Sequence, residues 1–372
     1  MSEGAGTADR SDDRTRTDGG TADTAPRSET VSDDVQTRFD RIAKSRRRRW
    51  IGISAVVAVV GYMFINALQA VEWFDANLTQ YLPTFAEALR DFFPFLVILD
   101  GFPFIWIDWS GFGQYWAFIT EQNLIYDDEF FADATSLVDY PITLLTGPGG
   151  PLGVLGVAGE TLAMGIAGTL MGLPFALLFG VLGSGRVTRF PFNFIFRGTM
   201  SAIRAIPALI WALIFVPLGG IGATTATLAI ATDTIGNLGR LYTDELEEIE
   251  DGPIEAIETA GGDKRQVVTF GMLSQVSTPF IAWTLYVFEI NVRIAVTLGI
   301  IGGGGLGQVL VVQEGLFAYT NMMATILVIL VLIISVELFS QRLRARIRGD
   351  EPTGFIELLK GFPRRMAESA LK

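Results

Sequence analysis

Long apolar stretches alternate with polar segments along this chain. Residues 51–71, 161–185 and 315–336 contain no Asp, Glu, Lys or Arg. A helix needs roughly 20 predominantly apolar residues to cross a hydrocarbon core about 30 Å thick. Because three stretches reach that length, the pattern predicts an all-α, polytopic membrane protein rather than a soluble protein with buried core helices.

Further apolar stretches extend this pattern to about six membrane-spanning helices. The fourth is the most polar, because Asp233 and Asn237 lie within it, and we expect both side chains to face the interior of the bundle. The second contains Gly168 and Gly172 at the GxxxG spacing, which lets a neighbouring helix approach closely. The predicted helices cover residues 50–71, 155–183, 193–216, 222–240, 277–300 and 316–339.

Basic residues lie next to the ends of several predicted helices. Arg46–Arg49 precede the first helix, Arg186 and Arg189 follow the second, and the Arg342–Arg348 segment follows the last. Basic clusters that flank spanning helices mark the cytoplasmic side. An even number of helices places all these clusters on that side. We therefore expect a multi-pass protein of the cell (plasma) membrane with both termini in the cytoplasm.

The polar segments divide the chain into five regions. The N-terminal region has almost no large apolar side chains and cannot offset its ordering entropy by burial. The region after the first helix has one basic residue and many acidic ones, so we place it outside, with its short aromatic pieces at the interface. The predicted regions are a disordered cytoplasmic tail at 1–48, the first helix at 49–73, an extracellular acidic segment at 74–150, the main transmembrane domain at 151–340 with a cytoplasmic loop at 241–275, and a basic cytoplasmic tail at 341–372.

The composition narrows the possible chemistry. The chain has no Cys and no His, which removes thiolate nucleophiles, imidazole bases and the usual zinc ligands. It has no GxxxxGK[ST] sequence and hence no phosphate-binding loop of its own. We therefore predict a non-enzymatic membrane subunit with no cofactor, no metal and no nucleic-acid partner. The net charge of −12, with Asp frequent in the polar segments, is typical of a halophile's acidic surface.

The loop before the fifth predicted helix, residues 248–280, has the most informative pattern. Pro253 suits the first turn of a short helix, and Asp251 can cap that turn. Gly261 or Gly262 can take the left-handed conformation that ends a helix. The pattern predicts a short helix, a sharp turn and a second helix that leads into the membrane. Such a helix either lies in the groove of a partner or belongs to an ordinary solvated loop.

This loop resembles that of ABC importer permeases, which reads EAA, three residues, Gly, nine residues and Ile-x-Leu-Pro. The resemblance implies that the segment Glu255–Gly261, which includes Glu258, is the coupling helix that docks into an ATP-hydrolysing subunit. The matching residues are Glu255, Ala256, Gly261 and Leu273, and the departures are Ile257, Gly271 and Ser274, which replace Ala, Ile and Pro.

Three other stretches are similar to phosphonate-type permeases, at 160–178, 204–215 and 288–308, and the similarity covers about residues 155–340. It implies the ABC importer permease (MetI-like) fold and a translocation pathway for phosphonate or a related oxyanion, such as phosphite or phosphate. The implied partners are ABC ATPase subunits, an extracellular substrate-binding protein, and a second copy of this chain or a paralogous permease, within membrane lipid.

Ionisable residues inside the predicted helices are candidates for the pathway, because their burial in lipid is costly. Glu289 and Arg293 have the i,i+4 spacing of an intrahelical pair, so they either neutralise each other or leave Arg293, with Asn291, facing a polar pathway. The planar guanidinium suits phosphoryl oxygens. Arg204 precedes Pro207, which is expected to kink the helix. It either lines the pathway or bonds the carbonyl that Pro207 frees.

Two features lie at the predicted outer ends of the helices. Glu160 is expected to reach water from the second helix. The glycines at 302–305 are expected to form an outer gate or turn, or to allow tight packing. The GxGxxG match at 302–307 is not a dinucleotide motif, because it follows a spanning helix rather than a strand.

Other functions fit parts of this pattern. An importer of another solute, such as an amino acid or a quaternary amine, would share the same loop. An ion-coupled secondary transporter would be expected to show inverted repeats or paired broken helices, and neither is clear in the sequence. A membrane scaffold or sensor would leave the loop at 248–280 without a function.

Overall fold

The computed structural model describes residues 27–73, 78–98, 105–132, 139–147 and 149–348. The chain forms two units, residues 1–82 and 83–372. Helix α1 (Arg27–Ala70) belongs to the first unit, and α2 (Leu78–Phe92) begins there and continues into the second.

Helix α1 contains the first predicted span. Its segment Arg46–Ala70 is long and apolar enough to cross a membrane, and none of its most apolar stretch is buried. The prediction of a disordered tail is wrong for residues 27–48, which continue the same helix. Lys44 and the arginines at 46–48 are good helix formers, so they readily continue the helix of the adjacent apolar segment. Residues 1–26 lie outside the described part of the chain.

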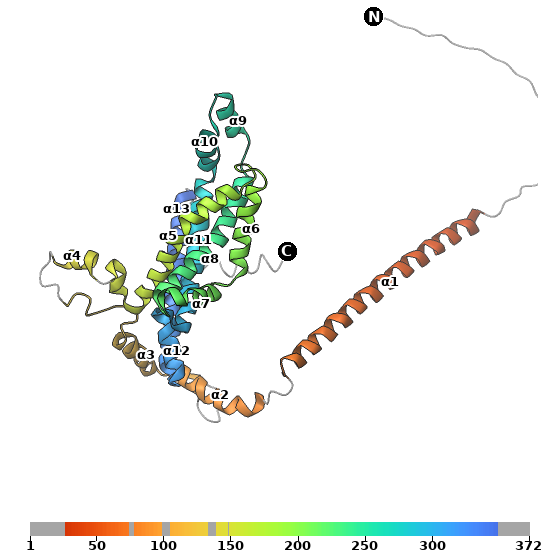
Figure 1. Cartoon of the computed structure of the whole chain (residues 1–372). Coiled ribbons are helices and arrows are strands. Elements are labelled where there is room, and N and C mark those ends of the chain that lie inside the picture. The colour runs from red at the N-terminus through yellow and green to blue at the C-terminus, as the bar shows by residue number, and fades with distance from the viewer. Residues whose placement is uncertain (1–26, 74–77, 99–104, 133–138, 148, 349–372) are drawn as a thin grey trace, which may run out of the picture. The chain divides into compact units, whose positions relative to one another are not determined.

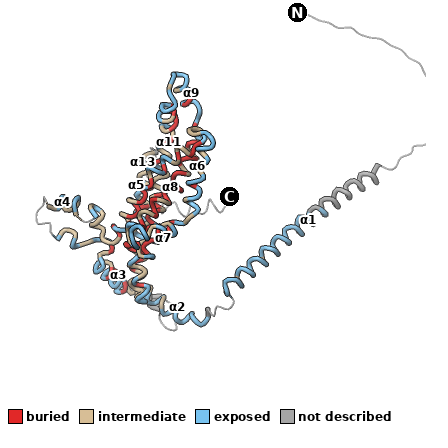
Figure 2. Tube along the Cα trace, viewed as in Figure 1, coloured by how far each residue is buried: buried red, intermediate tan, exposed pale blue. Residues whose placement is uncertain are grey.

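The second unit is built on three long helices, α5, α8 and α11, which carry most of its buried residues (Figures 1 and 2). Helix α13 packs against α11, while α6 and α7 pack against α8. The helices are α3 (Ser110–Glu121), α4 (Asp139–Thr146), α5 (Gly156–Gly183), α6 (Phe192–Ala205), α7 (Ala208–Gly219), α8 (Ala223–Glu247), α9 (Gly252–Thr259), α10 (Lys264–Gln266), α11 (Leu273–Leu298), α12 (Gly305–Gly315) and α13 (Tyr319–Arg348).

The predicted GxxxG pair lies at the contact between α5 and α8. A Cβ atom on Gly168 would lie 2.4 Å from Ile230 Cγ2, and one on Gly172 would lie 2.5 Å from the Ala231 carbonyl oxygen. Both distances are far below van der Waals contact. The two helices can approach this closely only because both α5 positions lack a side chain.

The third predicted helix, 193–216, is wrong as a single helix. It is divided into α6 and α7, which meet at an angle of 92°. Pro207 lies between them and cannot donate a hydrogen bond to the Ile203 carbonyl one turn earlier. That carbonyl accepts hydrogen bonds from the Ile206 amide and the Trp211 indole instead, each at 3.2 Å. The predicted kink is therefore a complete break.

The segment after α11 is more structured than the sequence indicated. An irregular turn at Gly299–Gly303 ends α11 at the predicted glycine run. The next helix, α12, was not predicted. Helix α13 then begins at Tyr319 and continues to Arg348, so the arginines of residues 342–348 extend the last span by two turns. The predicted basic tail beyond residue 348 lies outside the described residues.

The segment at 74–150 folds into short elements. Strands β1 (Leu96–Ile98) and β2 (Ile105–Ile107) pair antiparallel, with Val97 opposite Trp106, so this short pair is an exception to the all-α prediction. A 3₁₀ turn at Gly150–Leu155 leads into α5. The buried Tyr115 hydroxyl on α3 donates to the Phe92 carbonyl. Burial raises the pKa of Tyr115 to about 12, so the phenol remains a donor near neutral pH.

Four helices among the described residues are long and apolar enough to span a membrane, and there are five if α6 and α7 count as one bent span. The fourth predicted span, at 222–240, is helical as α8 but does not belong to that set. The polar residues of α8 make it less apolar than the other spans. Asp233 is buried, and Asn237 donates a hydrogen bond to its carboxylate at 2.9 Å. Both therefore face inward, as predicted.

Candidate functional site

The loop between α8 and α11 forms the predicted short helix, turn and second helix. Helix α9 has Pro253 in its first turn, and Gly261 follows the helix with φ of +82°. After the turn, α10 and a π-helical turn at Val267–Met272 lead into α11. Figure 1 places α9 and α10 at one end of the helices of this unit and α12 at the opposite end.

Helix α9 has a buried face and an exposed face. Ile254 is buried in the core cluster that includes Val267 and Met272, and Ile257 packs against the same cluster. A Cβ atom on Gly271 would lie 3.3 Å from Ile257 Cδ1, so the loop backbone passes close to α9. The half-buried side chain of the motif residue Leu273 also packs there. The motif residues on the exposed face are Glu255, Ala256 and Glu258.

The predicted cap of α9 is wrong, because Asp251 makes no side-chain hydrogen bond to the first turn. Its carboxylate instead accepts a hydrogen bond from Arg186 Nη1 at 2.5 Å. A capping box forms one helix later, where Asp263 and Gln266 bond each other's backbone amides at 2.8 Å. The sequence reveals local capping patterns, but the competing partner of Asp251 lies 65 residues away.

The predicted intrahelical pair on α11 is also wrong. Glu289 accepts a hydrogen bond from Arg344 on α13 at 2.7 Å, and Arg293 lies 3.6 Å from Glu337 on α13. The first pair is nearly buried, with side chains 18% and 8% exposed, whereas the second is 47% and 42% exposed. Two ion pairs therefore connect α11 to α13. Local residue spacing does not predict them, because the partners lie on different helices.

Asn291 connects the three central helices. Its side-chain amide donates to Thr169 Oγ1 on α5 and to Thr234 Oγ1 on α8, both at 2.8 Å. Asn291 is fully buried, so its polar atoms face neighbouring helices rather than a surface. The expectation that it accompanies Arg293 along a pathway has no support in this arrangement. Its interhelical bonds give it a packing role.

Arg204 lies in the last turn of α6, at the break before α7, and its side chain is exposed. Since Trp211 and the Ile206 amide bond the carbonyl freed by Pro207, Arg204 is not needed for that purpose. Its charge lies close enough to Asp233 on α8 to interact with it. The expected bond from Arg204 to that carbonyl is therefore not formed, and a position along a pathway stays a prediction.

Glu160 does more than reach water. Its carboxylate accepts a hydrogen bond from the Gly305 amide, and Thr161 Oγ1 accepts one from the Leu306 amide, both at 2.9 Å. These two amides begin α12, and a helix N-terminus favours anionic and oxygen acceptors. The start of α5 therefore fixes the glycine turn at 302–305, the predicted outer gate or turn.

Replacing Glu160 with alanine is expected to loosen α12. Loss of one hydrogen bond to a charged acceptor costs about 1 kcal/mol at an exposed position, which makes local opening roughly fivefold more frequent. Hydrogen–deuterium exchange of peptides covering the start of α12 measures this change. The Glu160→Gln variant keeps an acceptor oxygen and serves as the control. Equal exchange in wild type and the alanine variant would contradict the assigned contact.

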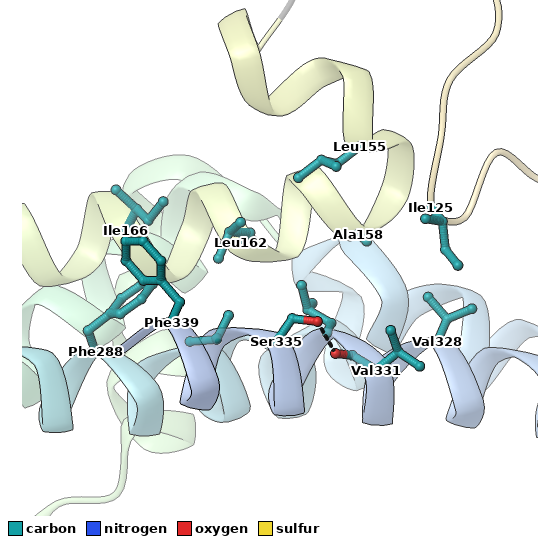
Figure 3. Close-up of a pocket in the computed structure, with 12 residues that line it drawn as sticks. Ile125, Leu155, Ala158, Leu162, Ile166, Phe288, Val328, Val331, Ser335 and Phe339 are labelled. Atoms are coloured by element: carbon teal, nitrogen blue, oxygen red, sulfur yellow. Dashed lines mark hydrogen bonds between the residues drawn. The ribbon is translucent and has the colours of Figure 1, made fainter. Parts of the chain in front are cut away.

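A cavity of about 430 Å³ opens between α5, α11 and α13 (Figure 3). Its lining is apolar apart from Ser335, whose hydroxyl donates to the Val331 carbonyl at 2.7 Å and is thereby satisfied. No ionisable side chain lines the cavity, so it offers an oxyanion no compensating charge. The lining residues are Ile125, Leu155, Ala158, Leu162, Ile166, Phe288, Val328, Val331, Leu332, Ser335, Val336 and Phe339.

Comparison with known proteins identifies the family of this chain. The family of binding-protein-dependent transport system inner membrane components matches residues 172–349, which include α9 and its loop. The phosphite transport system permease protein of Stutzerimonas stutzeri is 32% identical over 190 residues, which are 51% of this chain and 69% of that protein. The chain belongs to this family. It is therefore a membrane subunit of a transport system, and the resemblance stated from the loop is confirmed.

Two other similar proteins extend the comparison. The cryptic phosphonate transport system permease protein PhnE2 of Escherichia coli K12 is 37% identical over 117 residues, which are 32% of this permease and 96% of that protein. A chain of the MetNI methionine ABC transporter in an inward-facing conformation is 20% identical, with a TM-score of 0.48, over 57% of this permease and 99% of that chain.

Proposed function

We propose that this permease is the translocation subunit of an ATP-driven importer for a phosphorus oxyanion such as phosphonate, phosphite or phosphate. The observation that carries the proposal is α9, a short helix anchored by Ile254 and Ile257 that exposes Glu255, Ala256 and Glu258. An exposed helix face on a fixed support suits docking into a partner's groove. The phosphite and phosphonate permeases among the similar proteins support the substrate class.

The proposal includes three partners and an orientation. An ATPase subunit binds α9 in the cytoplasm, a substrate-binding protein delivers the oxyanion on the opposite side, and a second permease subunit completes the pathway. Both termini lie in the cytoplasm, as the arginine clusters indicate. ATP binding draws the two ATPases together, and hydrolysis resets them. Each nucleotide state shifts the permease between outward-open and inward-open conformations because it contacts them differently.

Arg204 and Arg293 are the residues that we propose to attract the oxyanion along the pathway. Both side chains are exposed in the single permease subunit, and Arg293 is only loosely paired. Guanidinium groups bind phosphoryl oxygens through two parallel hydrogen bonds. Glu289 and Asn291 are left out of this role, because Glu289 bonds to Arg344 and the Asn291 amide nitrogen bonds to two threonines within the subunit.

Uptake by the reconstituted complex tests the proposal. The chain is co-expressed with a candidate ATPase and a candidate substrate-binding protein. The purified complex is placed in vesicles, and ATP is supplied on the side of the membrane that carries the ATPase. Labelled methylphosphonate, phosphite and phosphate are offered separately, with methionine and glycine betaine as controls. We expect ATP-dependent uptake of at least one phosphorus oxyanion and none of the two controls.

Other outcomes identify the alternative functions. Uptake of methionine or glycine betaine alone would assign the same machinery to another solute. Uptake that requires an ion gradient and no ATP would show a secondary transporter. Absence of any co-purifying ATPase would remove the assigned role of α9.

A further inference from the structure

We infer that Arg186 is a positioning residue that transmits movement of α9 to α5 and α6. The inference rests on the proposed function, in which an ATPase moves α9. It concerns four charged residues at the base of α9 that the loop motif does not include. We call these four residues the α9 clamp: Arg186, Arg197, Glu247 and Asp251.

Arg186 connects the start of α9 to the end of α8. It lies in the loop after α5, its Nε donates to the Glu247 carbonyl at 3.2 Å, and its Nη1 donates to Asp251 Oδ1 at 2.5 Å. The two acceptors flank the short linker between α8 and α9. A guanidinium holds its donors in a rigid fork, so one side chain can fix both sides of this linker.

Arg197 completes the clamp from α6. It forms an ion pair with the Glu247 carboxylate, and its Nε donates to the Gly183 carbonyl at 2.8 Å. Glu247 also accepts a hydrogen bond from the Gly185 amide at 3.3 Å. The ends of α5 and α8, the first turns of α6 and the start of α9 are therefore connected through four charged side chains.

The clamp supplies a connection that the chain itself does not. Along the backbone, α9 leads to α8 through the short linker on one side and to α11 through Gly261 on the other. Ile254 and Ile257 hold its inner face against the segment before α11. Helices α5 and α6 are not adjacent to α9 along the backbone. Arg186 connects the loop after α5 directly to Asp251 at the start of α9, and Arg197 connects α6 to Glu247 at the end of α8. These contacts are a route by which movement of α9 reaches both helices.

The test compares Arg186→Gln, Asp251→Asn and the double variant with Arg189→Gln. Arg189 lies in the same loop, and no side-chain ion pair is found for it among the described residues. Each variant is assembled with the ATPase and binding protein in vesicles. ATPase co-purification, basal ATP hydrolysis, hydrolysis stimulated by loaded binding protein, and uptake are measured for each.

We expect Arg186→Gln to bind the ATPase normally and to keep basal hydrolysis, while stimulation and uptake fall together by about fivefold or more, the usual size of coupling between sites. Asp251→Asn should likewise keep ATPase binding and basal hydrolysis and lose stimulation and uptake. The double variant should be no worse than the more severe single variant, because both single substitutions disrupt the same Arg186–Asp251 contact. Arg189→Gln should resemble wild type.

Two results would overturn the inference while leaving the proposed function intact. One is stimulation and uptake in Arg186→Gln equal to those of Arg189→Gln, with wild type active. The other is loss of ATPase binding in Arg186→Gln, which would make Arg186 part of the docking surface. If Arg186→Gln fails to fold, Asp251→Asn tests the same contact. The Asp251 side chain is 70% exposed, so its substitution should leave folding intact. Inactive wild type would instead count against the proposed function.

Discussion

Replacing Ala256 with arginine is expected to reduce ATP-dependent uptake by more than about 30-fold, the effect of losing roughly 2 kcal/mol at the centre of an interface. Ala256 is exposed on α9, between the exposed Glu255 and the half-buried Ile257. A long charged side chain at this position would hold α9 away from a close-fitting groove and would place a charge in a desolvated interface. Co-purification of the ATPase and uptake into vesicles measure the loss.

The matched control makes the same substitution at Ala132, an exposed residue outside the candidate membrane spans. The Ala132→Arg variant should bind the ATPase and transport as wild type does. Because Ala256 is exposed, Ala256→Arg should also insert and melt like wild type. Normal ATPase binding by the Ala256→Arg variant would show that the exposed face of α9 is not the docking surface.

The largest effect on stability is expected for Arg344→Met. This substitution leaves the Glu289 carboxylate, 8% exposed, without its partner at 2.7 Å. Breaking a nearly buried ion pair by removing one member strands a charge and costs about 3 kcal/mol or more. Denaturant unfolding in detergent micelles should report the decrease. Adding Glu289→Gln to the same variant should recover at least half of the loss, because the stranded group is then neutral.

Arg293→Met provides the matched control on the same pair of helices. The Arg293–Glu337 pair is wider, at 3.6 Å, and both side chains are more than 40% exposed. Exposed pairs contribute roughly 0–1 kcal/mol, so this variant should be nearly as stable as wild type. A similar loss in Arg293→Met and Arg344→Met would show that burial does not set the difference between the two pairs.

Local patterns in the sequence determined several features correctly. Pro253 and Gly261 bounded α9, because each residue type restricts the backbone at its own position. The GxxxG spacing of Gly168 and Gly172 identified the face of α5 that meets α8. Asp233 and Asn237 were correctly placed inside the bundle, because charged and amide groups are excluded from lipid.

The sequence did not predict side-chain contacts between residues that lie far apart along the chain. Asp251 has the residue type and position of a helix cap, yet Arg186 holds its carboxylate. Glu289 and Arg293 have the spacing of an intrahelical pair, yet each pairs with α13. In both cases a local contact competes with a distant one of similar chemistry. The packing of the helices determines that the distant contact forms.

By itself, the sequence determined that this protein is a helical membrane permease with a short helix, a glycine turn and a second helix between α8 and α11, because apolar length, charge distribution and residue spacing are local properties. Only the tertiary structure decided how that loop is supported. Arg186 and Arg197 contact Glu247 and Asp251 across at least 50 residues. Such contacts depend on how α5, α6 and α8 pack, and no periodicity along the chain encodes which charged side chains meet.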